Sequence, residues 1–91
     1  MKDYDAILCP VAPFPAPAHG ATMDEKNKFA FTYTSAYNYT GWPGVVVRGS
    51  TSDENLPIGV QIVSRPWRED VAIALAFVLE SSLGGWQAPR I

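Results

Sequence analysis

Cysteine and histidine are almost absent from this chain of 91 residues, which has one of each, Cys9 and His19. A single cysteine cannot form an internal disulfide, and a chain without a cysteine–histidine cluster offers no structural zinc site. No metal site is therefore expected. Because structural disulfides are typical of oxidising compartments, their absence favours a cytoplasmic location.

Basic residues are also few, since seven lysines and arginines stand against nine acidic residues and give a net charge of −2. Without a basic surplus to hold a phosphate backbone, nucleic acid is not an expected partner. Long apolar runs are missing too, because none approaches the roughly 20 residues that span a bilayer. The polar start Met1–Asp5 also lacks the apolar core of a signal peptide. No membrane span is expected.

Apolar surface, in contrast, is plentiful. About 47% of the residues are hydrophobic, and they include three tryptophans, four tyrosines and four phenylalanines. The chain also has eight prolines and seven glycines, which favour breaks and turns. A chain this short buries only about 60 to 65% of its unfolded surface. It therefore carries more apolar surface than it can cover by itself.

Hydrophobic periodicity and breakers predict three strands and two helices in an α/β arrangement. The predicted strands cover residues 4–10, 45–50 and 56–64, with a polar loop at 51–55. One helix is predicted from Asp24 to Tyr39, capped by Thr22 or Asp24. The other is predicted from Glu69 to Leu83, with Gly84-Gly85 as its C-cap. Residues 11–18 are proline-rich and predict extended, irregular backbone or a linker.

Two segments look too apolar for a small free-standing domain. Ala6–Cys9 is an unbroken apolar run, which is typical of strands buried on both faces in parallel or mixed sheets. Residues 71–79 are apolar throughout, which predicts a helix buried nearly all round. Gly59 inside a strand indicates a bulge or the close approach of another backbone. Three strands and two helices cannot cover such a helix, so the rest of its core is expected in sequence outside this chain.

No complete set of catalytic residues is present. Cys9 and His19 are the only nucleophile–base pair, and the cysteine, in an apolar strand before a proline, is better explained as a core residue. No serine lies in a G-x-S-x-G motif, and the three lysines are in polar surroundings. An independent cysteine–histidine hydrolase stays open as an alternative, which inactivation by Cys9→Ala would support.

Four motifs in register resemble the C-terminal part of the amidase signature family. The first is Asn38-Tyr39-Thr40-Gly41-Trp42-Pro43-Gly44, which precedes a strand and follows Thr34 by four residues. The others are Asp5–Pro17, Leu56–Val63, with Asn55 where the family has glycine, and Arg65–Asp70 followed by an apolar helix. The resemblance covers nearly all of residues 4–83.

This resemblance implies a C-terminal segment, residues 1–91, of a single amidase domain whose fold is a mixed β-sheet flanked by helices. The family hydrolyses the C–N bond of carboxamides and needs no cofactor. Its nucleophilic serine is activated by a lysine through a second serine on a cis peptide. Those residues belong to the family's N-terminal part and map to no residue here. The segment alone is therefore not expected to hydrolyse amides.

The resemblance implies a role in the substrate pocket instead. In members similar to fatty acid amide hydrolase, the helix before the motif asparagine lines the substrate channel. The matching residues are Phe31 and Ser35, one turn apart, and Lys28 a turn earlier. Ordinary core packing of Phe31 is the alternative. The proline-rich segment at residues 11–18 is a second expected wall of this pocket.

The expected partners are the N-terminal remainder of the amidase fold and a small-molecule amide. Exposed apolar patches should also cause the segment to self-associate. The alternative is a non-catalytic binding or interaction module built on the same half-fold, which should be monomeric and melt cooperatively.

Overall fold

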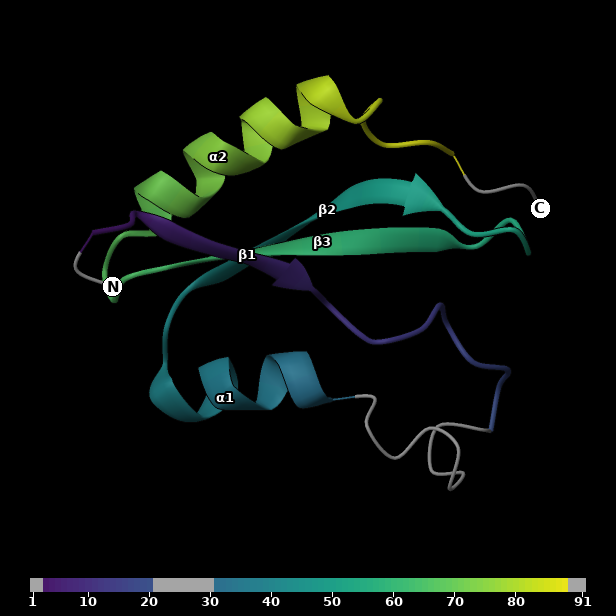
Figure 1. Cartoon of the computed structure of the whole chain (residues 1–91), viewed down its shortest axis with the longest axis horizontal. Helices are drawn as coiled ribbons and strands as arrows, with labels where there is room; N and C mark the ends of the chain where they lie inside the picture. Colours follow the sequence, from purple (N-terminus) through teal and green to yellow (C-terminus); the bar gives the residue numbers. More distant parts are fainter. Residues whose placement is uncertain (1–2, 21–30, 89–91) are drawn as a thin grey trace.

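The computed structural model describes residues 3–20 and 31–88 and places a three-stranded sheet between two helices. Figure 1 shows helix α2 along one face of the sheet and the shorter helix α1 below the opposite face. The predicted α/β arrangement of three strands and two helices is confirmed. Within the described residues, no helix is both long and apolar enough to cross a membrane.

The sheet is formed by β1 (Ala6–Pro10), β2 (Gly44–Thr51) and β3 (Pro57–Ser64) in the order β1-β3-β2. Both pairings are antiparallel, so the described strands contain no parallel pair of the mixed sheet that the family resemblance implies. A bulge interrupts the β2–β3 pairing between Arg48 and Ser50. The polar loop predicted between these strands is confirmed, and Asn55 there has a φ of 67°.

Helix α2 (Glu69–Ser82) covers one face of the sheet, starting at the predicted residue. Its two acidic residues in the first turn complement the positive end of the helix dipole. Ile62 of the central strand is fully buried against Ala72 and Ala76 of the helix, so small helical side chains allow close packing. Partly buried side chains from β1, β2 and α2 complete this core.

Helix α2 is not buried all round by this chain, as expected for an apolar helix whose core continues in sequence outside it. Ile73, Phe77 and Val78 are exposed, and Phe77 keeps 67% of its surface. Leu8 of β1, in the run expected to be buried on both faces, is 60% exposed. For α2 the reason is that one sheet covers only one stripe of a helix. Leu8 pairs with Ile62 on the face that carries α2, but α2 packs mainly over β2 and β3 and leaves the edge strand β1 uncovered.

Helix α1 (Thr32–Thr40) begins later than the predicted start at Asp24. The carbonyl of Phe31 accepts hydrogen bonds from the backbone N–H groups of Thr34 and Ser35, at 3.2 and 3.0 Å. The predicted caps, Thr22 and Asp24, lie outside the described residues. Gly41, with a φ of 78°, ends the helix in the left-handed conformation that glycine adopts without strain.

Candidate substrate pocket

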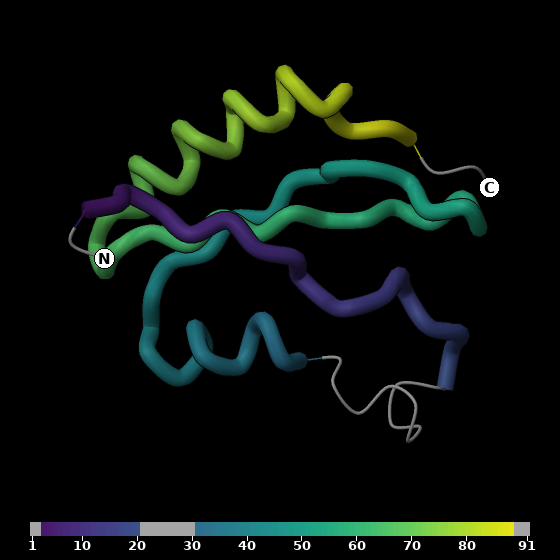
Figure 2. The backbone as a smooth tube through the Cα atoms, viewed as in Figure 1, coloured from purple at the N-terminus to yellow at the C-terminus, as the bar shows by residue number. Residues whose placement is uncertain are grey.

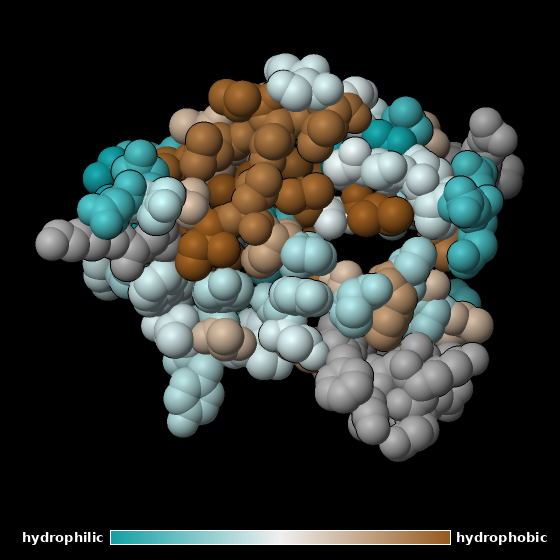
Figure 3. Space-filling view, in the orientation of Figure 1, coloured by the Kyte–Doolittle hydropathy of each residue, from teal (hydrophilic) through white to brown (hydrophobic). Residues whose placement is uncertain are grey.

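A pocket of about 710 Å³ lies between the proline-rich segment after β1, one face of α1 and strands β2 and β3. We call it the α1 pocket. Figure 2 shows the chain leaving β1 and diverging from the sheet before α1 begins, and Figure 3 shows a hollow in this region. The lining residues are Val11, Ala12, Pro13, Phe14, Pro15, Ala16, Pro17, Phe31, Thr34, Asn38, Val46, Pro57, Ile58 and Gly59.

Prolines and one glycine shape this pocket. Proline has no backbone N–H and a fixed φ, so the wall made by residues 11–17 is extended and poor in hydrogen-bond donors. A Cβ on Gly59 would lie 2.8 Å from Cγ1 of Val46 and 3.2 Å from Cγ2 of Val11. The predicted close approach of another backbone at Gly59 is wrong, because two valine side chains make the tight contacts and the carbonyl of Val47 makes only an ordinary one. The predicted bulge lies opposite, in β2, where the register shifts between Arg48, which pairs with Gly59, and Ser50.

The lining is apolar apart from two side chains on α1. Thr34 and Asn38 are one turn apart and lie on the same helix face as Phe31. Every other lining residue in the described part of the chain is aliphatic, aromatic, proline or glycine, so no charged side chain is among these residues. Such a pocket suits an uncharged apolar group, with a hydroxyl and an amide at one side for hydrogen bonding.

The residues predicted from the sequence fall in different places. Phe31 lines the pocket and is 60% exposed. Ser35 is not among the lining residues, and its hydroxyl donates to the carbonyl of Phe31 at 2.8 Å. Lys28 lies outside the described residues. The pocket roles of Thr34 and Asn38 were missed, although their spacing of three and seven from Phe31 places all three on one helix face.

Gln61 of β3 links the sheet to α1 beside this pocket. The residue is 7% exposed, and its Nε2 donates to the carbonyl of Tyr33 at 3.0 Å and to the Sγ of Cys9 at 3.3 Å. Burial, followed by the nearby Cys9 thiol, raises the pKa of Tyr37 on the same helix. The thiol therefore belongs to a polar contact between β1, β3 and α1.

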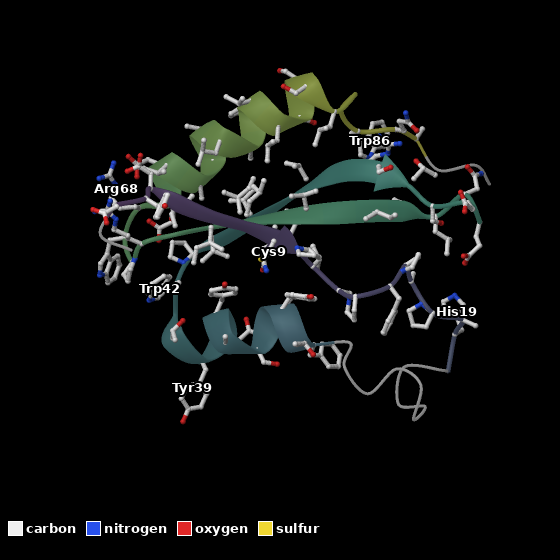
Figure 4. All side chains as sticks on the ribbon, viewed as in Figure 1. Cys9, His19, Tyr39, Trp42, Arg68 and Trp86 are labelled. Atoms are coloured by element: carbon white, nitrogen blue, oxygen red, sulfur yellow. The ribbon has the colours of Figure 1, made fainter. Side chains whose placement is uncertain are left out.

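The cysteine–histidine pair is not assembled as a catalytic site. Figure 4 shows Cys9 on the side of β1 toward α1, whereas His19 lies at the far end of the proline-rich segment. Across residues 3–20 and 31–88, no group of three histidine, cysteine or acidic side chains could hold a metal ion. Two serines have structural partners instead: Ser82 donates to the Val78 carbonyl and Ser64 to the Arg68 carbonyl.

Known proteins similar to this chain carry amidase and amidotransferase names. The sequence model of the family named Amidase matches residues 1–72. A glutamyl-tRNA(Gln) amidotransferase subunit from Beijerinckia indica is 36% identical over 93 residues, covering 99% of this chain and 18% of the relative. The human protein fatty-acid amide hydrolase 2 is 31% identical over 89 residues, covering 98% of this chain and 16% of the relative. No solved structure matches the chain.

A third relative, the corresponding amidotransferase subunit from Bartonella bacilliformis, is 32% identical over 90 residues and is likewise matched over 18% of its length. The chain thus spans less than a fifth of the length of these curated relatives. The family match covers most of the chain, and the motifs that carry it lie on β1, α1, β2 and β3. The chain belongs to the amidase family, as a C-terminal segment of it.

Proposed function

We propose that this chain is the C-terminal segment of an enzyme that hydrolyses the C–N bond of a carboxamide. The catalytic serines and lysine would lie in the rest of the amidase domain, outside this chain, and act in the cytoplasm. The segment supplies sheet core and a wall of the substrate pocket. The α1 pocket is the observation that carries this proposal, because it has the size of a small-molecule site and is built from the motifs of the family.

The lining of the pocket favours an amide with an apolar acyl or aryl group. Among the described lining residues, an ionised group would find no side chain of opposite charge, and an unpaired buried charge is costly. The name of the human relative, fatty-acid amide hydrolase 2, describes a substrate with such a chain.

The test is the activity of the complete reading frame. We expect the DNA upstream of the Met1 codon to encode, in frame, a Gly/Ser-rich segment preceded by a lysine. The enzyme expressed from that whole frame should release ammonia from decanamide, whereas the chain of 91 residues alone should not. A complete enzyme that is inactive on every amide tried would refute the proposal.

The alternative is a non-catalytic binding module on the same half-fold. It rests on the absence of a complete catalytic set in the described part of the chain. A stop codon directly upstream, together with a monomeric chain that melts cooperatively, would support the module. A frame shared with the catalytic segment would exclude it.

Phe31→Ala tests the pocket wall in the complete enzyme. Removing the ring should enlarge the site, so kcat/KM for bulky acyl or aryl amides should rise several-fold relative to acetamide. Tyr39→Ala is the matched control, because Tyr39 is an aromatic residue of the same helix that points away from the sheet (Figure 4). Equal losses on all substrates after Phe31→Ala would count against a pocket role.

Ser35 and Lys28 are also proposed as substrate contacts, on the strength of the family resemblance. Ser35→Ala and Lys28→Ala should each raise KM in the complete enzyme. A KM equal to that of the wild type for every amide would remove the residue concerned from the site.

A further inference from the structure

Helix α1 carries one side of the α1 pocket yet has little packing of its own. None of its residues is buried, and Phe31, Thr34 and Asn38 face the pocket from one side of the helix. A helix of nine residues is marginal in isolation and depends on tertiary contacts for its place. The distance between α1 and the sheet, and with it the width of the pocket, must therefore be fixed by a few specific contacts.

The side chain of Gln61 makes such a contact. It leaves the central strand on the face toward α1, because Ile62, the next residue, is buried against α2 on the other face. Its amide nitrogen donates hydrogen bonds to two other elements, to the Tyr33 carbonyl of α1 and to the Cys9 thiol of β1. On its other side, Oε1 lies beside Gly44, where an added Cβ would be 3.5 Å away. The side chain thus spans the sheet beneath the helix.

We propose that Gln61 is a positioning residue that fixes α1 against the sheet and so sets the width of the α1 pocket. This inference rests on the proposed function only in taking the pocket to be the site of the substrate acyl group. Gln61 does not line the pocket and acts through Tyr33, one residue from Thr34 in the helix.

The chemistry at this position requires two donated hydrogens. A primary amide nitrogen carries two hydrogens, one for each of its acceptors, whereas a carboxylate has none and leucine has no polar atom. Gln61→Leu therefore removes both hydrogen bonds and leaves the Tyr33 carbonyl without this donor. Gln61→Glu keeps the shape but, when ionised, turns an oxygen toward that carbonyl oxygen.

Hydrogen exchange of the α1 amides measures directly, in this chain, how firmly Gln61 holds α1 against the sheet. We expect exchange at residues 35–41 to quicken about tenfold in Gln61→Leu and in Gln61→Glu at neutral pH. Ser64→Ala is the matched control: Ser64 is also buried in β3, but its hydroxyl donates at 2.6 Å to the Arg68 carbonyl at the start of α2. That variant should quicken exchange in the first turn of α2 and leave α1 unchanged.

The pH dependence of Gln61→Glu separates hydrogen bonding from packing. Burial raises the pKa of a carboxyl, and the protonated acid regains an O–H donor for the Tyr33 carbonyl. Exchange in α1 should therefore return toward the wild-type rate as the pH falls. The titratable groups on the elements around residue 61 are Cys9 of β1, Arg48 of β2 and Tyr33, Tyr37 and Tyr39 of α1. Arg48 lines the hollow toward α2 and Tyr39 points away from the sheet. Wild type and Gln61→Leu are therefore measured over the same pH range.

Kinetics of the complete enzyme test the consequence for the pocket. In Gln61→Leu, KM for decanamide should rise about tenfold while kcat changes by less than about twofold, and KM for acetamide should stay unchanged. Wild-type exchange in α1 for both Gln61 variants would overturn the inference. Faster exchange in α1 with no change of KM for any amide would support the role of Gln61 in holding α1. It would refute the proposal that the α1 pocket binds the acyl group of the substrate.

Discussion

Gly59 is the residue at which the pocket tolerates least change. Its missing side chain leaves room for Val46 and Val11, and an added Cβ would come within 2.8 Å of the first of these. We expect Gly59→Ala to destabilise the chain by about 1–3 kcal/mol, because overpacking displaces well-packed neighbours. Gly59→Val should cost more. The free energy of unfolding, measured in urea, checks both.

Gly44→Ala provides the matched comparison in the neighbouring strand. Its Cβ would meet the Gln61 side chain at 3.5 Å and Val63 at 3.8 Å, which are ordinary contacts. The change should therefore cost much less than Gly59→Ala. Equal destabilisation by the two variants would contradict crowding at Gly59 as the cause, because the loss of backbone freedom in the unfolded chain on changing glycine to alanine stabilises the folded state.

Individual pocket residues were harder to predict than the pocket itself. The helix face that lines a site depends on where the helix begins and how it is rotated about its axis. With a start at Asp24 assumed, Phe31 and Ser35 shared a face, whereas in α1 Phe31 is the N-cap and Thr34 and Asn38 line the pocket. Phe31 was found because its neighbours match the family, and Gln61 was missed because its partners are more than 25 residues away in sequence.

At the scale of elements, the start of α2 is stabilised by an ion pair. The guanidinium of Arg68 donates to both carboxylate oxygens of Asp70, at 3.0 and 3.2 Å. The hydrogen bond from Arg68 lowers the pKa of Asp70, although both side chains are largely exposed. Since the pKa is lower in the folded chain than in the unfolded chain, the pair stabilises the fold above the ordinary carboxyl pKa of about 4.

Asp70→Asn should therefore lower the melting temperature slightly at pH 7, and the difference should vanish as the pH falls through the carboxyl pKa. Because the pair is exposed, added salt should also reduce the difference. Asp53→Asn, in the exposed loop between β2 and β3, is the control and should change little. A difference that persisted at pH 2 would contradict the ion-pair explanation.

The elements were predictable where one strong local signal was enough. β2 and β3 follow from β-branched runs around a polar loop, and α2 follows from its acidic start and the Gly84-Gly85 stop. The start of α1 was not predictable, because Thr32, Tyr33 and Thr34 have weak helix propensity and packing decides where the helix forms. The low exposure predicted for Leu8 failed because burial depends on neighbours that a strand's own sequence does not specify.

At the scale of the whole molecule, the described chain is too open for its apolar content. Its radius of gyration is 14.3 Å, against about 12 Å for a compact domain of this length. Figure 3 shows a broad hydrophobic area over α2 and the adjoining strand. A second hollow of about 340 Å³ lies between β2, α2 and Trp86, with an apolar lining broken by Arg48 and Glu80. These surfaces are where we expect the remainder of an amidase domain to pack.

An isolated chain should cover the same surface with further copies of itself. Ile73, Phe77 and Val78 of α2 are exposed to solvent, the first two beside the hollow toward β2, and contiguous apolar area of this kind drives association in water. We expect sedimentation to show mass that increases with concentration. The double change Phe77→Lys and Val78→Lys should shift the chain toward monomer by at least about tenfold in dissociation constant, because both side chains lie on the exposed face and two charges disfavour its burial.

The matched control is Tyr39→Lys, which places a lysine at a 95% exposed aromatic position on α1, in the opposite layer. It should leave the association unchanged, whereas loss of association in this variant would move the contact to α1. A wild-type chain that stays monomeric up to millimolar concentration would show that the apolar face of α2 is tolerated in water, which would favour the free-standing module. Association through α2, in contrast, would show that this helix needs a covering partner in water. The chain spans less than a fifth of the relatives' length, so the natural cover for α2 is then another part of the amidase domain.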